Sequence, residues 1–198
     1  MKATCFRSNP QLLIFMKIIT APLLASLLLI AVHAAPSPYA GEQSRQIKAL
    51  SEDEISNLLA GRGMGLARAA ELNSYPGPRH VLDLGAELSL STEQTAELTR
   101  LFDTMKASAL PLGRELVSRE TQLDGLFAGK QATAETVLAL TRGIGRLQGE
   151  VRAVHLNTHI ATVALLQPGQ IARYDELRGY TSATPAQHDP AKHHGHQP

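Results

Sequence analysis

The chain has 198 residues, a formal net charge of +1 and 19% charged residues, so nothing points to nucleic acid or an anionic membrane as a partner. Tryptophan is absent and aromatic residues make up only 4% of the chain. Because Leu and Ala dominate and β-branched residues do not alternate with polar ones, the composition favours an all-α fold. The sequence contains no His-Glu-x-x-His, no nucleophile motif and no phosphate-binding loop, so we expect no enzyme.

A cleavable leader is predicted at residues 1–34. Met16 and Lys17 precede an apolar run that ends at Val32, and the following Ala34 completes a small-x-small pattern that signal peptidase accepts. This pattern favours Met16 over Met1 as the start of translation. The alternative is a retained anchor, but about fifteen apolar residues are short for a span that needs roughly 20. We therefore expect a periplasmic protein without stable membrane insertion after cleavage.

Removal of the leader would leave about 160 residues, which suits one domain. It would also remove Cys5, the only cysteine, and with it any disulfide or thiolate metal site. We divide the rest into an N-terminal extension with short helices (35–80), a helical domain (81–180) and a histidine-rich tail (181–198). The tail is polar and lacks periodicity, so we expect it to be disordered.

The extension opens its first predicted helix at Ser51. In the run Ser-Glu-Asp-Glu, the Ser51 side chain can accept the backbone N–H of Glu54 while the Glu54 carboxylate returns to the backbone of Ser51. Gly61 should end this helix, and further short helices are predicted at 66–72 and 80–88. The glycine-rich run that starts at Gly61 is a helix-breaking turn and not a nucleotide loop, because no strand precedes it and no Lys-Ser/Thr follows.

A long antiparallel helical hairpin dominates the predicted domain. Ser91 caps the first helix with Gln94 completing the box, residues 128–132 reverse the chain, and Thr133 caps the second helix. Apolar residues recur every seven positions, so each helix can bury one narrow seam against the other. The seam residues are Leu98, Phe102, Met105, Ala109, Leu112, Leu116, Leu123 and Leu126 on the first helix, and Val137, Leu140, Ile144, Leu147, Val151, Val154, Thr158, Ala161 and Leu165 on the second.

Irregular residues inside the hairpin predict two further features. Pro111 removes one backbone hydrogen bond, so we expect a kink near Ala107, which would serve a cradle and be tolerated in a bundle. Glycine in a helix interior costs roughly 0.5–1 kcal/mol relative to Ala. A close helix crossing would compensate for this cost at Gly143, Gly145 and Gly149.

Leu156, Ile160 and Val163 form a second apolar stripe on the side of their helix opposite to the seam. One hairpin cannot bury both sides. The stripe therefore needs the N-terminal helices, a second subunit or a client protein as its cover. We interpret it as a candidate client-binding or partner-binding surface.

Two similar phrases open the first and last helices of the domain. They read Leu-Ser-Thr-Glu-Gln at 90–94 and Leu-Gln-Pro-Gly-Gln at 166–170, and proline at the first helical position of the last helix loses no hydrogen bond. On that helix, Ile171, Tyr174 and Leu177 are expected to face inward. The phrases are structural in our interpretation, through Leu90, Ser91, Gln94, Leu166, Pro168 and Gln170.

The leader, the hairpin and the paired Leu-Thr-x-x-Gln-like phrases resemble the periplasmic Spy/CpxP family, whose relatives include zinc-resistance-associated proteins and periplasmic heavy-metal sensors. The resemblance spans 88–180, and 39–78 is similar to the N-terminal extension of one subgroup. Ser91 and Gln167 stand where the family has Thr. The resemblance implies a curved all-α homodimer that binds unfolding proteins without ATP. Other members restrain an envelope sensor kinase, which is a second possible partner.

Histidines support a rival function in metal binding. The tail contains His188, His193, His194 and His196, and neutral imidazoles are good ligands for Zn, Cu and Ni. His155 and His159 are one helical turn apart and could contact one ion. No third ligand is near them in sequence, so the alternative is two surface histidines beside the seam.

The sequence thus predicts an exported, ATP-independent chaperone-like protein that requires no cofactor. Periplasmic binding, sensing or resistance toward Zn, Cu or Ni is the alternative function.

Overall fold

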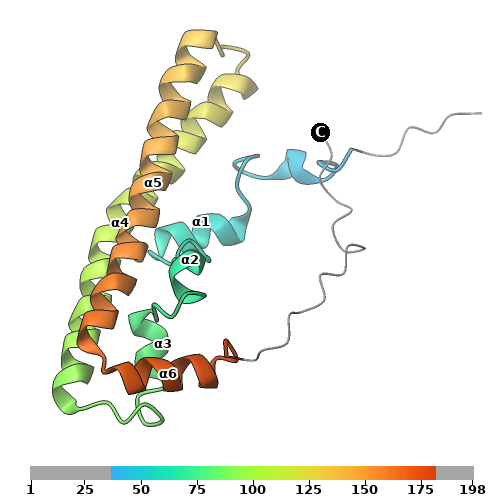
Figure 1. The fold of residues 1–198 in the computed structure, drawn as a ribbon. Helices are drawn as coiled ribbons and strands as arrows, with labels where there is room; N and C mark the ends of the chain where they lie inside the picture. The colour runs from blue at the N-terminus through green and yellow to red at the C-terminus, as the bar shows by residue number, and fades with distance from the viewer. Residues whose placement is uncertain (1–36, 182–198) are drawn as a thin grey trace, which may run out of the picture. The chain divides into compact units, whose positions relative to one another are not determined.

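A computed structural model describes residues 37–181 of the chain (Figure 1). The predicted leader and the tail histidines His188, His193, His194 and His196 lie outside these residues. The described elements belong to a compact unit that begins at Tyr39. They are η1 (Glu42–Ser44), α1 (Glu52–Leu59), α2 (Arg68–Glu71), α3 (Pro78–Asp83), α4 (Thr92–Ala128), α5 (Ala134–Leu165) and α6 (Pro168–Leu177). The all-α class is confirmed. Between residues 37 and 181, no helix has the length and apolar character needed to cross a bilayer.

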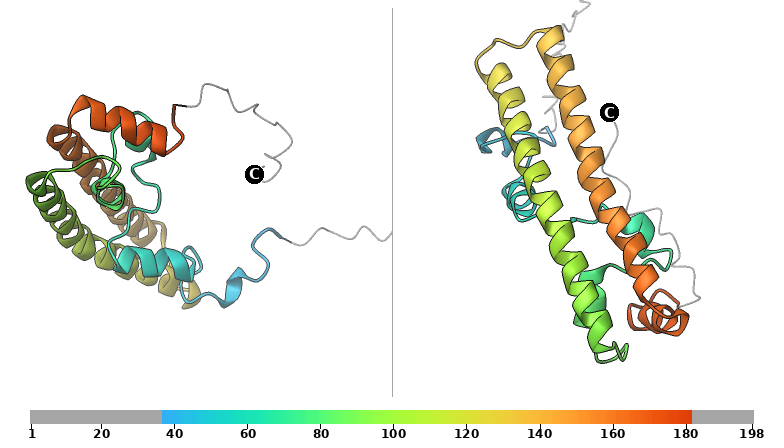
Figure 2. Two further views of the ribbon diagram at one scale, coloured as in Figure 1. Left: turned by 90° about the horizontal axis from the view of Figure 1, so that it is seen from below. Right: turned by 90° about the vertical axis from the view of Figure 1, so that its left-hand side faces the viewer.

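The long hairpin consists of α4 and α5, which lie side by side in both views of Figure 2. The Ser91 hydroxyl accepts the backbone N–H of Gln94 at 3.1 Å, and Gln94 Oε1 accepts the N–H of Ser91 at 3.0 Å. Thr133 caps α5 in the same way through Thr136. Both predicted caps are therefore confirmed. Every predicted seam residue is buried or half-buried, so the seven-residue spacing identified the covered side of each helix.

The expected crossing at Gly143, Gly145 and Gly149 is wrong. A Cβ built at any of these glycines would meet nothing within 4 Å, because no other element packs against them. The close approach occurs instead at Gly113 on α4, where a Cβ would lie 2.2 Å from the carbonyl oxygen of Leu58. Helix α4 continues through Pro111 as one element.

The N-terminal extension packs on one broad side of the hairpin, as Figures 1 and 2 show. Helices α1 and α3 contact α4, while α2 and α3 contact α5. The capping box at Ser51 is confirmed, with the Glu54 carboxylate accepting the Ser51 N–H at 2.8 Å. The next two helices differ from their predicted bounds: α2 is shorter, and α3 begins earlier because Pro78 occupies its first turn.

Two apolar clusters hold the unit together. The first joins α3, α4 and α6 through Val81, Leu88, Leu98, Leu166 and Tyr174. The second joins α1 to the hairpin through Leu58, Leu116, Ile144 and Leu147. Helix α1 of the extension contributes Leu58 to the second cluster, and α3, which begins in the extension, contributes Val81 to the first, so the short helices are part of the core.

The inward face of α6 differs in part from the prediction. Tyr174 is fully buried and Ile171 is half-buried, as expected. Leu177 is 37% exposed, so its expected inward position is wrong. Asp175 is buried instead, because its carboxylate accepts the hydroxyl of Ser74 at 2.6 Å and thereby ties α6 to the extension.

Candidate functional site

The two sequence phrases meet in space through their last residues, Gln94 and Gln170. Gln94 Nε2 donates to Gln170 Oε1 at 2.8 Å, and Gln170 Nε2 donates to Gln94 Oε1 at 3.0 Å. Each amide also bonds to a backbone carbonyl near the other phrase: Gln94 to Leu165 at 2.8 Å and Gln170 to Leu88 at 3.2 Å. We call this reciprocal pair the glutamine junction.

The glutamine junction connects the first turn of α4 with the C-terminal end of α5 and the start of α6. Both Oε1 atoms also accept the N–H that precedes their own helix, from Ser91 and from Gln167. Leu166 is buried and Leu90 packs on the same apolar cluster. Pro168 occupies the first turn of α6. Sequence reasoning treated the phrases as separate helix starts, whereas each glutamine caps its own helix and binds the other.

The predicted apolar stripe is only partly covered. Leu156 and Val163 are half-buried, whereas Ile160 is 57% exposed. Two other large apolar side chains are similarly exposed toward the tip of the hairpin, Phe127 at 56% and Leu138 at 50%. The hairpin therefore presents apolar groups to its surroundings at several separate positions.

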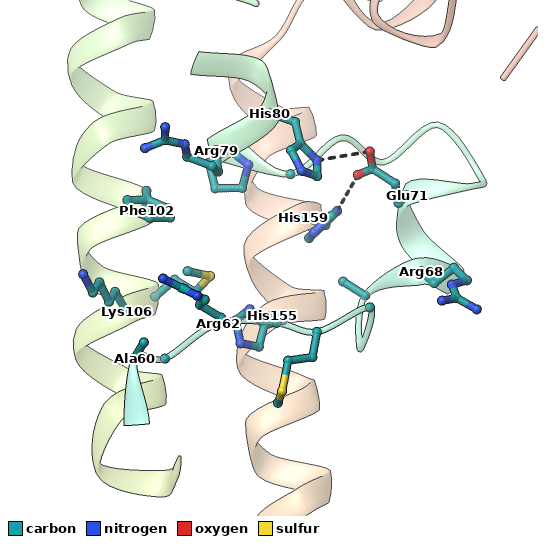
Figure 3. A pocket seen from close by; sticks show the side chains of 18 of the residues that line it. Ala60, Arg62, Arg68, Glu71, Arg79, His80, Phe102, Lys106, His155 and His159 are labelled. Carbon is teal, nitrogen blue, oxygen red and sulfur yellow. Dashed lines mark ion pairs between the residues drawn. The ribbon is translucent and has the colours of Figure 1, made fainter. Parts of the chain in front are cut away.

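A cavity of about 790 Å³ lies between the extension and the hairpin (Figure 3). Its volume is in the range of small-molecule sites. Its lining is mainly the glycine-rich chain from Ala60 to Ala67, with Phe102 and Met105 of α4 and His155 and His159 of α5. Gly61 and Gly65 adopt positive φ angles of 66° and 79°, which lets the chain curve around the cavity.

Positive charge dominates the cavity lining. Four cationic side chains belong to it, Arg62, Arg68, Arg79 and Lys106, against one acidic side chain, Glu71. Figure 3 shows Arg62, Arg79 and Lys106 on the side of the cavity next to α4. The sequence did not reveal these four cations as a group, because they are spread over three helices and the turn before α2, and the total charge is balanced.

Glu71 is the buried centre of a polar network that sequence reasoning missed. Its Oε1 accepts the hydroxyls of Tyr174 and, at 3.1 Å, of Tyr180. Nδ1 of His80 lies 3.3 Å from Oε1, and Nε of Arg178 lies 3.7 Å from it. The network connects α2 and α3 with the C-terminal end of α6, so one carboxylate joins three segments.

Burial alone would raise the pKa of Glu71, but hydrogen bonds from His80, Tyr174 and Tyr180 outweigh it and lower the pKa from 4.5 to about 2. The ionised carboxylate therefore stabilises the folded chain at all pH values above the unfolded pKa. This stabilisation is lost as the pH falls through the folded pKa. Burial and hydrogen bonding to Glu71 also raise the pKa of Tyr174, so its hydroxyl stays protonated and donates.

His155 and His159 are not the surface pair that the sequence allowed. Both point toward the extension, and His155 is only 5% exposed. Nδ1 of His159 lies 2.6 Å from the carbonyl oxygen of Tyr75. Burial, followed by the nearby His159, lowers the pKa of His155 and keeps its imidazole neutral. In the described part of the chain, no three His, Cys, Asp or Glu side chains are arranged to hold a metal ion.

No family model, curated protein or solved structure matches this chain. The resemblance to the Spy/CpxP family therefore stays a prediction that rests on the residues of the two phrases and on the order of the predicted elements.

Proposed function

We propose that the protein is an ATP-independent, chaperone-like protein of the periplasm that binds unfolded envelope proteins along the apolar side chains of its hairpin. One observation carries the proposal: Phe127, Leu138 and Ile160 are each at least half exposed on helices whose seam is otherwise well packed. An exposed apolar side chain gains free energy when an unfolded segment covers it, roughly in proportion to the apolar area that is buried.

The way these side chains are displayed suits weak and unselective binding. Hydrophobic contacts are non-directional, so an unfolded segment needs no particular sequence to gain from covering them. The hairpin that carries them is held by its own caps and by the glutamine junction, so the apolar groups stay exposed instead of collapsing onto one another. Their separation along the hairpin would allow one extended segment to contact several of them.

The proposal is tested by light scattering of a denatured protein that aggregates after dilution. Protein without residues 1–34 should suppress the scattering at equimolar ratio without nucleotide. Ile160→Ser should weaken suppression, because it removes the most exposed apolar side chain of the stripe while leaving the seam intact. Leu177→Ser is the matched control, since Leu177 is also exposed but lies on α6. Equal aggregation with and without the protein would refute the proposal.

The same proposal includes membership of the Spy/CpxP family and a homodimeric state, with an envelope sensor kinase as a further possible partner. The paired phrases support it, because both glutamines of the family pattern make equivalent bonds in the glutamine junction. Sedimentation equilibrium of the protein would test the dimer. A monomer at all concentrations would contradict this part of the proposal.

A second candidate function is the binding or sensing of Zn, Cu or Ni, and the four closely spaced tail histidines favour it. Calorimetric titration with zinc should show binding that is lost when all four are replaced by alanine, as His188→Ala, His193→Ala, His194→Ala and His196→Ala. Absence of binding heat in the unmodified protein would remove this function.

A further inference from the structure

The cavity between the extension and the hairpin combines two kinds of lining that point to one class of ligand. Its apolar part includes Phe102, Met105, Met64 and Leu72, together with the bare backbone of the glycine-rich turn. Such a lining favours an aliphatic or aromatic body. Met side chains adapt readily to ligands of different shape.

Within the described part of the chain, three of the four cations of the lining lack an acidic partner. Arg79 pairs with Asp83 at 3.0 Å. Arg62 donates a hydrogen bond to the neutral side chain of Asn57 at 3.1 Å. Within residues 37–181, Arg68 and Lys106 have no acidic partner at all. All four side chains are exposed, and Figure 3 shows Arg62 and Lys106 toward α4 with Arg68 apart from them, so an anion would be attracted most strongly beside Arg62 and Lys106.

The single acid of the lining does not offset these cations. Glu71 accepts hydrogen bonds from two tyrosine hydroxyls and lies beside Arg178, so its charge is balanced within its own network. Figure 3 shows Glu71 with His80 and His159 at one end of the cavity, while Arg62 and Lys106 lie near the other.

We propose that this cavity binds one anionic amphiphile, a small molecule with an acidic headgroup and an aliphatic body. The headgroup lies beside Lys106 and Arg62, and the body contacts Phe102 and Met105. This ligand site does not depend on the proposed chaperone function. Ile160, the exposed residue of the apolar stripe, is not among the side chains that line the cavity.

The test is calorimetric titration of the full chain with decanoate, kept below its micellar concentration. We expect one decanoate per chain. Decanol, which has the same body without the charge, and inorganic phosphate, which has charge without the body, should each bind at least about tenfold more weakly, because each lacks one of the two contacts. Equal binding of decanol would show an apolar cavity only, and equal binding of phosphate would show a simple anion site. Either result would overturn the proposal.

A matched pair of variants locates the headgroup. Lys106→Met should weaken decanoate binding by about fivefold, the effect of one partly solvated ion pair. Arg114→Met removes the same charge from the same helix at a position outside the cavity, and should leave binding unchanged. Arg62→Met gives a second cavity variant, and circular dichroism verifies that all three fold. Equal effects of Lys106→Met and Arg114→Met would place the anion elsewhere and refute the site.

Discussion

Replacing Gly113 by alanine tests how the extension is joined to the hairpin. Gly113 lies in the middle of α4, under the C-terminal end of α1. The new Cβ would lie 2.2 Å from the carbonyl oxygen of Leu58 and 2.9 Å from its carbonyl carbon. Both are backbone atoms, which cannot rotate away as a side chain could. Helix α1 must therefore move away from α4 to admit one methyl group.

Two opposing terms set the expected magnitude. Alanine in a helix interior is more stable than glycine by roughly 0.5–1 kcal/mol. Displacement of α1 uncovers Leu58, which is 5% exposed, and full burial of a leucine side chain contributes about 1.5–3 kcal/mol. The packing loss exceeds the helix gain, so Gly113→Ala should lower the free energy of unfolding by about 1–2 kcal/mol.

Urea unfolding followed by circular dichroism measures this change, with Gly143→Ala as the matched control. Gly143 also lies inside a long helix, but nothing is within 4 Å of the position of its Cβ. Gly143→Ala should therefore raise the free energy of unfolding by roughly 0.5–1 kcal/mol. If both variants were stabilised equally, α1 would not be packed on α4 at Leu58, and the arrangement of the extension described above would be wrong.

Two further predictions concern the polar contacts. Gln94→Ala and Gln170→Ala should each lower the free energy of unfolding by about 1–2 kcal/mol, because half-buried amide and carbonyl groups lose hydrogen-bond partners. The double variant should lose less than the sum, and simple additivity in a double-mutant cycle would refute the glutamine junction. Glu71→Gln should cost about 3 kcal/mol near neutral pH, the equivalent of the lowered pKa. In urea titrations this difference should shrink as the pH falls from 4.5 toward 2, because protonation of Glu71 removes the same stabilisation from the unmodified chain. The control Glu87→Gln, at an exposed position, should change stability little at any pH. A Glu71→Gln deficit that persists at the lowest pH would contradict the lowered pKa.

Local signals in the sequence were sufficient for the long elements. The boxes at Ser51 and Ser91 involve residues three apart, so their hydrogen bonds can be predicted from side-chain chemistry alone. The seam follows from a repeat that persists over the length of both helices. Close approaches between helices could not be predicted from the glycines, because a glycine in a helix does not indicate whether another backbone lies against it. Gly113 is covered by α1, whereas Gly143 faces open space.

The polar network and the cavity depend on contacts between distant residues. Tyr174 is 103 positions from Glu71, and no periodic pattern connects a short extension helix with the last helix. The path of the extension also depends on residues with positive φ, which include Met64 and Ser74 as well as glycines. The sequence does not reliably indicate which non-glycine residues adopt a positive φ. The cavity and its cations could therefore be identified only after the extension was placed on the hairpin.

Site-specific photo-crosslinking tests most directly whether unfolded proteins bind the apolar stripe of the hairpin. Protein without residues 1–34 lacks Cys5 and contains no other cysteine, so Ile160→Cys can carry a single photoreactive label. We expect several-fold more crosslinking to a denatured protein from position 160 than from Arg114→Cys, an exposed position on α4, and little crosslinking to the same protein in its native state. Equal yields from the two positions, or equal yields with native and denatured protein, would contradict binding of unfolded proteins at the stripe.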